Sequence, residues 1–161
     1  QDPWYGLSSV LIDRDMASSG APAELVSQQM KACAASGDSC TNFQFYNTVP
    51  GATDSPKFDP SSTSISAGFR SAFQHVLAVP QVLGSPGIPE LKESMYKLGP
   101  NSYFSESEYP MAADTWKTRY WGDNYAKLLA VKQKYDETAL FWCYHCVGSD
   151  WAPTEQGAGQ R

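Results

Sequence analysis

Residue types that suit proton transfer gather at the end of a short segment, residues 101–105, which reads as extended. Tyr103, Ser105 and Glu106 follow one another closely there. A side-chain hydroxyl or carboxylate in such a cluster can take a proton from a reacting alcohol. Tyrosine has a reference pKa of about 10 and glutamate one of about 4.3, so Glu106 is the easier base at neutral pH.

The alternation of side chains along a strand limits what these residues can do together. Tyr103 and Ser105 fall on one face of an extended segment, and Phe104 and Glu106 fall on the other. They therefore face one substrate only if the strand bulges or ends. The plainer alternative is that Tyr103 is a core aromatic with a satisfied hydroxyl and Glu106 a solvated charge.

Two further groups of residues have types that suit binding. Asn124 and Tyr125 open a predicted helix, although Tyr125 also fits a core position on its apolar face. Cys33 and Cys40 flank a Gly-Asp turn and predict a disulfide if the protein is exported. Cys143 and Cys146 enclose His145, and they can pair with each other or with another chain, remain buried thiols, or bind zinc. The six-residue gap between Cys33 and Cys40 is atypical for zinc, so no metal site is predicted.

The elements that must position these residues follow from apolar spacing. Short strands are expected at residues 9–12 and 41–49, and a helix with Pro22 near its start carries Val26, Met30 and Cys33 on one face. Further helices are expected where apolar residues recur at helical spacing, over residues 65–76, 89–98, 115–120 and 123–135. The strands are too few for a complete sheet. We therefore expect an α+β fold, an antiparallel sheet with helices on one face that is incomplete alone.

The bulk composition excludes several classes of protein. The 161 residues are 42% apolar and 18% charged, which is typical of a globular domain. A net charge of −5 argues against a nucleic-acid partner, and no apolar run approaches the roughly 20 residues of a membrane helix. The start at Gln1 and the even number of cysteines lead us to expect a secreted protein whose leader has been removed.

Several stretches resemble the flavin-linked oxidases of the vanillyl-alcohol oxidase (VAO) type, in particular the berberine-bridge-enzyme-like group and its secreted fungal isoamyl-alcohol-oxidase-like branch. The resemblance covers most of the chain, loosely before residue 60. The stretches are ISAGFR at residues 65–70, YFSE at 103–106, WGDNY at 121–125, KQKYDETALF at 132–141 and VGSDW at 147–151.

The resemblance implies an oxidase that moves a hydride from an alcohol or similar reduced carbon to FAD, with dioxygen as acceptor. FAD would be held, often covalently in such proteins, by an N-terminal chain or fragment of the same precursor that acts as the partner of this chain. Residues 1–100 would belong to the substrate-binding domain, residues 101–152 would return to the flavin domain, and residues 153–161 would form a frayed tail.

The resemblance also suggests roles for the residues that match its motifs. Tyr103 would lie beside the flavin and the substrate, with Ser105 next to it and Glu106 as base, while Asn124 and Tyr125 would reach the flavin. Ser105 stands where the family has Asn, and Glu106 where many relatives have a second Tyr, which argues against a tyrosinate base. The alternatives are a zinc-stabilised structural domain, or a non-catalytic binding module whose ligand platform is Trp116, Trp121, Trp142 and Trp151.

Overall fold

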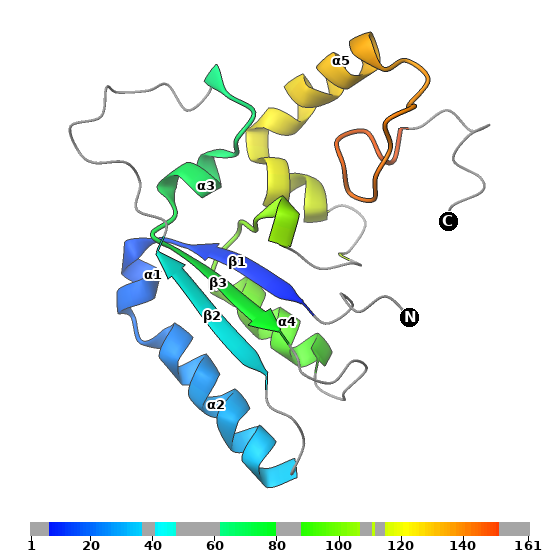
Figure 1. The fold of residues 1–161 in the computed structure, drawn as a ribbon. Helices are drawn as coiled ribbons and strands as arrows, with labels where there is room; N and C mark the ends of the chain where they lie inside the picture. The colour runs from blue at the N-terminus through cyan, green and yellow to red at the C-terminus, as the bar shows by residue number, and fades with distance from the viewer. Residues whose placement is uncertain are drawn as a thin grey trace.

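The computed structural model describes residues 7–36, 41–47, 62–79, 88–106, 111 and 115–151. These residues form a three-stranded antiparallel sheet in the order β1-β3-β2 (Figure 1). The strands are β1 (Ser8–Ile12), β2 (Asn42–Asn47) and β3 (Gln74–Val79). In the central strand, Val76 is opposite Val10 on one side and Phe45 on the other. The register therefore turns Val10 and Val76 toward the same face of the sheet.

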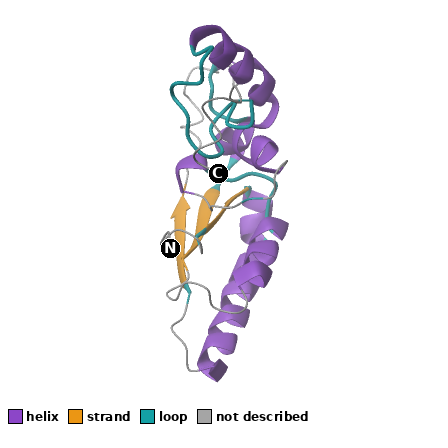
Figure 2. Ribbon diagram, turned by 90° about the vertical axis from the view of Figure 1, so that its right-hand side faces the viewer, coloured by secondary structure: helices purple, strands orange, loops and turns teal. Residues whose placement is uncertain are grey.

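Helices cover that face. Helix α1 (Arg14–Ser18) follows β1 directly, capped by Asp13, whose carboxylate accepts the N–H of Met16 at 2.8 Å. Helices α2 (Ala21–Ser36) and α4 (Ile88–Lys97) run along one side of the strands (Figure 2). Their apolar side chains meet those of the sheet in one core, formed by Val10, Ile12, Leu25, Val76, Ala78, Leu91, Met95 and Leu98. The predicted α+β class, with helices on one face of an antiparallel sheet, is confirmed.

The helix predicted over residues 65–76 is wrong. A short helix, α3 (Ala67–Ser71), begins at Ser66, whose hydroxyl accepts the N–H of Phe69 at 3.3 Å. It ends at Ala72, which has extended backbone angles, and β3 follows. The helical spacing of apolar residues is fortuitous here, because Val76 and Ala78 face the helices while His75 and Leu77 face the opposite side. Hydrogen bonding to strands on both edges outweighs the local pattern.

The second half of the chain joins the sheet at Asn101, whose carbonyl accepts the N–H of Leu11 at 2.8 Å. A 3-10 turn (Phe104–Glu106), a π-helical turn (Lys117–Trp121), a 3-10 turn (Gly122–Asn124) and α5 (Tyr125–Tyr135) follow. Their aromatic side chains form a second apolar cluster around Met111, Trp116 and Tyr120. The predicted domain boundary after residue 100 stays a prediction, and the predicted tail, 153–161, lies outside the described residues. No described helix is long and apolar enough to cross a membrane.

Candidate functional site

The face of the sheet opposite the helices carries a buried polar pair. Ser9 in β1 and His75 in β3 alternate with core residues and therefore point away from α2 and α4. The Ser9 hydroxyl lies 2.7 Å from His75 Nε2, and the two residues are only 1% and 4% exposed. Burial lowers the pKa of His75, and the negative charge of Glu106 opposes this in part. His75 is therefore neutral at pH 7.

Tyr103 and Glu106 both reach this pair, because the extended segment ends at Tyr103. The Tyr103 N–H donates to the Ser9 hydroxyl at 3.4 Å, and the Glu106 N–H donates back to the Tyr103 carbonyl at 3.2 Å. This single 3-10 turn brings Glu106 Oε2 to 3.5 Å from His75 Nδ1. The Tyr103 ring meets the His75 ring edge-on, with centroids 5.7 Å apart. The end of the strand thus removes the conflict that alternation predicted.

A hollow of about 680 Å³ opens next to Glu106. Its volume lies in the range of small-molecule sites, about 300–1,000 Å³. Polar groups from β2 and the 3-10 turn share its walls with apolar residues from β3 and from the start of β1. The lining residues are Leu7, Gln44, Tyr46, Leu77, Val79, Ser105 and Glu106.

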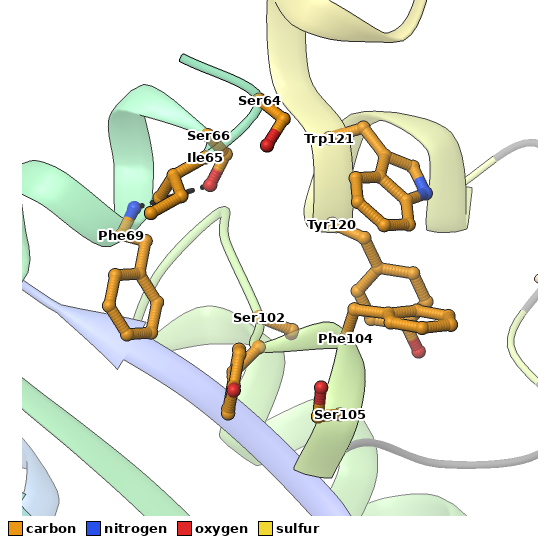
Figure 3. A pocket seen from close by; sticks show the side chains of 10 residues that line it. Ser64, Ile65, Ser66, Phe69, Ser102, Phe104, Ser105, Tyr120 and Trp121 are labelled. Carbon is orange, nitrogen blue, oxygen red and sulfur yellow. Dashed lines mark hydrogen bonds between the residues drawn. The ribbon is translucent and has the colours of Figure 1, made fainter. Parts of the chain in front are cut away.

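A second hollow of about 300 Å³ borders the same 3-10 turn (Figure 3). Phe69 and Ile65 line one side of it, and Phe104, Tyr120 and Trp121 line the other. Tyr103 and Ser105 also take part in the lining. Ser105 lines both hollows, so the two spaces adjoin at this turn.

Asn124 and Tyr125 hold parts of the chain together. Asn124 Nδ2 donates to the carbonyls of Thr63 and Ile65 at 3.2 and 3.1 Å. The Tyr125 hydroxyl donates to Asp150 Oδ1 at 2.9 Å, and burial, together with this hydrogen bond to the carboxylate, raises the pKa of Tyr125. The structure therefore does not bring these two side chains to the Tyr103–Glu106 turn, and their contact with a flavin stays a prediction.

Cys143 and Cys146 form a disulfide, which removes both thiols as metal ligands. Among the described residues, no group of three or more His, Cys, Asp or Glu side chains is arranged to hold a metal ion. The predicted pairing of Cys33 with Cys40 involves Cys40, which lies outside the described residues.

The predicted tryptophan platform does not form as one exposed surface. Trp116 is only 3% exposed and stacks on His145, with centroids 5.1 Å apart. Trp142 is half-buried and donates its Nε1–H to the carbonyl of Ser149 at 3.1 Å. These side chains fill the interior of the second half of the chain, so they favour a structural role.

Comparison with known proteins adds the family. Residues 88–148 match the family described as berberine and berberine like. A FAD-linked oxidoreductase of Aspergillus flavipes is 30% identical over 99 residues, which cover 61% of this chain and 16% of the relative. A VAO-type flavoprotein oxidase of Thermothelomyces thermophilus is 42% identical over 52 residues, 32% of this chain and 9% of the relative. Over residues 88–148 this chain is similar to the berberine-like family, and its curated relatives are FAD-linked oxidoreductases.

The fold of this chain is shared with solved structures of VAO-type flavoproteins. The crystal structure of the VAO-type flavoprotein MtVAO615 from Myceliophthora thermophila superposes with a TM-score of 0.64 at 22% identity, over 89% of this chain and 27% of that one. MtVAO713 from the same fungus gives the same TM-score at 19% identity, over 90% and 27%. The chain thus spans about a quarter of the solved VAO-type proteins and less of the first curated relative. Its place in the isoamyl-alcohol-oxidase-like branch stays a prediction.

The sequence did not point to Ser9, His75, Gln44 or Tyr46 as members of this site. His75 was missed because residues 65–76 were read as a helix, in which it has no relation to Ser9. One signal could have found it: His75 directly precedes the apolar run 76–79, which has the length of a short buried strand. Gln44 and Tyr46 alternate with Phe43 and Phe45, so the strand prediction already placed them on the face away from the core.

Proposed function

We propose that this chain forms the substrate side of an FAD-dependent oxidase that acts on an alcohol or a similar reduced carbon, with dioxygen as the final acceptor. The observation that carries the proposal is the convergence of Tyr103, Glu106 and His75 on the face of the sheet opposite the helices. The names of the relatives, FAD-linked oxidoreductases and a VAO-type oxidase, support the redox chemistry. The FAD-binding part of the same precursor is the proposed partner.

The residues of the hollow next to Glu106 fit a planar ring system with polar edges. Leu7, Leu77 and Val79 offer apolar contact, and Gln44 and Tyr46 offer hydrogen-bonding groups. We propose that these residues, with Tyr103 and Ser105, border the flavin and the substrate. When bound, FAD supplies a hydride acceptor. Asn124 and Tyr125 then support the site from a distance, through the chain segments that they tie together.

Glu106 is the proposed general base. Its side chain is 49% exposed, so a substrate hydroxyl can reach it. As the C–H hydrogen leaves with its electron pair, the hydroxyl proton goes to the Glu106 carboxylate and the C–O bond becomes C=O. Tyr103 donates a hydrogen bond to the substrate oxygen and orients it. General-base catalysis of this kind contributes about 10²–10⁴-fold.

Export of the protein is part of the proposal. The disulfide between Cys143 and Cys146 supports it, because disulfides persist in oxidising compartments.

The test uses the full-length protein that contains this chain, purified with its flavin. Primary and secondary alcohols, including ones with aromatic bodies, are added without oxygen. We expect at least one of them to bleach the flavin absorbance, and oxygen to restore the colour with formation of hydrogen peroxide. Glu106→Gln should slow bleaching by about 10²–10⁴-fold while the bound flavin stays visible. Glu137→Gln, at an exposed position after α5, is the matched control and should react like the parent. A colourless protein, or equal rates for Glu106→Gln and the parent, would refute the proposal.

A further inference from the structure

The hydrogen bonds around Ser9 determine which nitrogen of His75 carries the hydrogen. The Tyr103 N–H can only donate, so the Ser9 oxygen accepts this hydrogen bond. The hydroxyl hydrogen of Ser9 is then available for His75 Nε2, 2.7 Å away. Serine could also accept from Nε2, so the opposite side of the ring decides. There the Glu106 carboxylate lies 3.5 Å from Nδ1. A carboxylate attracts an N–H and repels a lone pair, which favours hydrogen on Nδ1.

We propose that His75, held as the Nδ1–H tautomer by Ser9, is a positioning residue that orients the Glu106 carboxylate toward the substrate. The inference rests on the proposed function, in which Glu106 is the base. The Nδ1–H engages Oε2 and leaves Oε1 directed to the alcohol. His75 itself exchanges no proton: the hydroxyl proton passes to Glu106 and the hydride to FAD.

The surroundings of the two residues show why such a contact matters. Glu106 ends a single 3-10 turn with its side chain half exposed, so its carboxylate would otherwise sample many rotamers. His75 belongs to the central strand, is buried, and lies between the rings of Tyr103 and Tyr46, at centroid distances of 5.7 and 6.2 Å. A rigid donor thus fixes a mobile acceptor. Distances near 3.5 Å commonly shorten when a substrate fills the site.

The two amide substitutions at position 75 separate the two ring nitrogens. The amide nitrogen of His75→Asn falls near the place of Nδ1 and can still donate to Glu106. The amide of His75→Gln reaches toward the place of Nε2 and loses that contact. In the flavin-loaded, full-length protein, we expect the rate of anaerobic flavin reduction to stay within about fivefold for the Asn variant. It should fall by about 10–100-fold for the Gln variant, with little change in substrate affinity, since one fixed hydrogen bond to a charged group is worth about 1.5–3 kcal/mol.

A double variant distinguishes positioning from general damage. Because His75 acts through Glu106, His75→Gln should cost little further rate in a Glu106→Gln background. Rates that fall independently in the double variant would overturn the proposal, as would equal losses in the Asn and Gln variants. If His75→Gln fails to fold, Ser9→Ala in both backgrounds provides the same comparison.

A readout without turnover keeps this inference separate from the proposed function. Nitrogen NMR of the ¹⁵N-histidine-labelled protein reports which ring nitrogen of His75 is protonated. We expect hydrogen on Nδ1, and a signal that shifts in the Glu106→Gln variant. Hydrogen on Nε2 would overturn the positioning role even if the enzyme oxidises alcohols. A parent protein that no alcohol reduces would instead overturn the proposed function, and with it the role of His75 in that reaction.

Discussion

Removing one buried hydroxyl, in Ser102→Ala, should destabilise the protein strongly for so small a change. Ser102 is 1% exposed, and its hydroxyl donates to the Ser9 carbonyl at 2.6 Å while it accepts from Arg119 Nε at 3.1 Å. Arg119 is itself buried, donates to the Gly99 carbonyl at 2.9 Å, and lies over the ring of Tyr96. The hydroxyl therefore links the second half of the chain to strand β1.

The magnitude follows from the two bonds. A neutral hydrogen bond contributes about 1 kcal/mol net and one to a charged group about 1.5–3 kcal/mol. Since the Ser9 carbonyl and the Arg119 Nε–H stay buried without this partner, we expect the free energy of unfolding to fall by about 2–4 kcal/mol. Urea unfolding of the full-length protein measures it, with an unchanged slope showing that the transition keeps its cooperativity.

Ser105→Ala is the matched control, because Ser105 is exposed, three residues away, and of the same type. Exposed substitutions usually change stability by no more than about 0.5 kcal/mol. If Ser102→Ala shifted the unfolding midpoint no more than Ser105→Ala does, the hydroxyl would not link the two halves, and the account of this part of the fold would be wrong.

Further predictions concern the buried residues Met95 and His145. Met95→Ala, at a fully buried position, should cost about 2–5 kcal/mol in unfolding free energy, whereas Lys97→Ala at the exposed end of α4 should cost little. Burial lowers the pKa of His145 to about 4, so the folded state keeps this ring neutral at pH values where the unfolded chain, near 6.5, takes up a proton. Its contribution to stability should be complete above pH 6.5 and decline as the pH falls toward 4. NMR titration of the ring tests this, and a midpoint near 6.5 would contradict it.

The sequence predicted the position of two elements but not the faces that they bury. The helix with Val26, Met30 and Cys33 and the strand with Phe43 and Phe45 are found as α2 and β2. Met30 and Phe45 are nevertheless 50% and 43% exposed, and Leu25 is the residue of α2 that enters the core. The central strand was not predicted, because Ile65, Phe69, Ala72, Phe73 and Val76 happen to follow a helical period. Hydrogen bonds to β1 and β2 determine the conformation of β3, and the residues that it pairs with are more than 25 positions away in the sequence. The spacing of apolar residues within a short stretch of sequence carries no information about these distant pairings.

The sequence indicated which residue types could form the candidate site, but it did not predict the turn that brings them together. Tyr103 and Glu106 were selected as chemically suitable, and strand alternation then argued that they face opposite ways. The structure resolves this with the hydrogen bond from Glu106 N–H to the Tyr103 carbonyl, which turns the chain directly after the strand ends. The turn lacks the glycine or proline that would announce it in the sequence. Its position follows from the attachment of residues 101–103 to β1, which is a tertiary effect.

Ser9 joins the stability of this region to its proposed chemistry. Its carbonyl accepts the Ser102 hydroxyl, while its own hydroxyl meets the Tyr103 N–H and His75 Nε2. Removal of the Ser102 hydroxyl should therefore disturb the site as well as the fold, because it loosens the segment that carries Tyr103 and Glu106. His75→Asn changes the ring that orients Glu106 but leaves the Ser102 link intact. The first substitution should lower stability and alcohol oxidation together. The second loses the hydrogen bond between Ser9 and His75 Nε2 and should also lower stability, but it should leave alcohol oxidation nearly unchanged, so the two effects can be separated in one set of proteins.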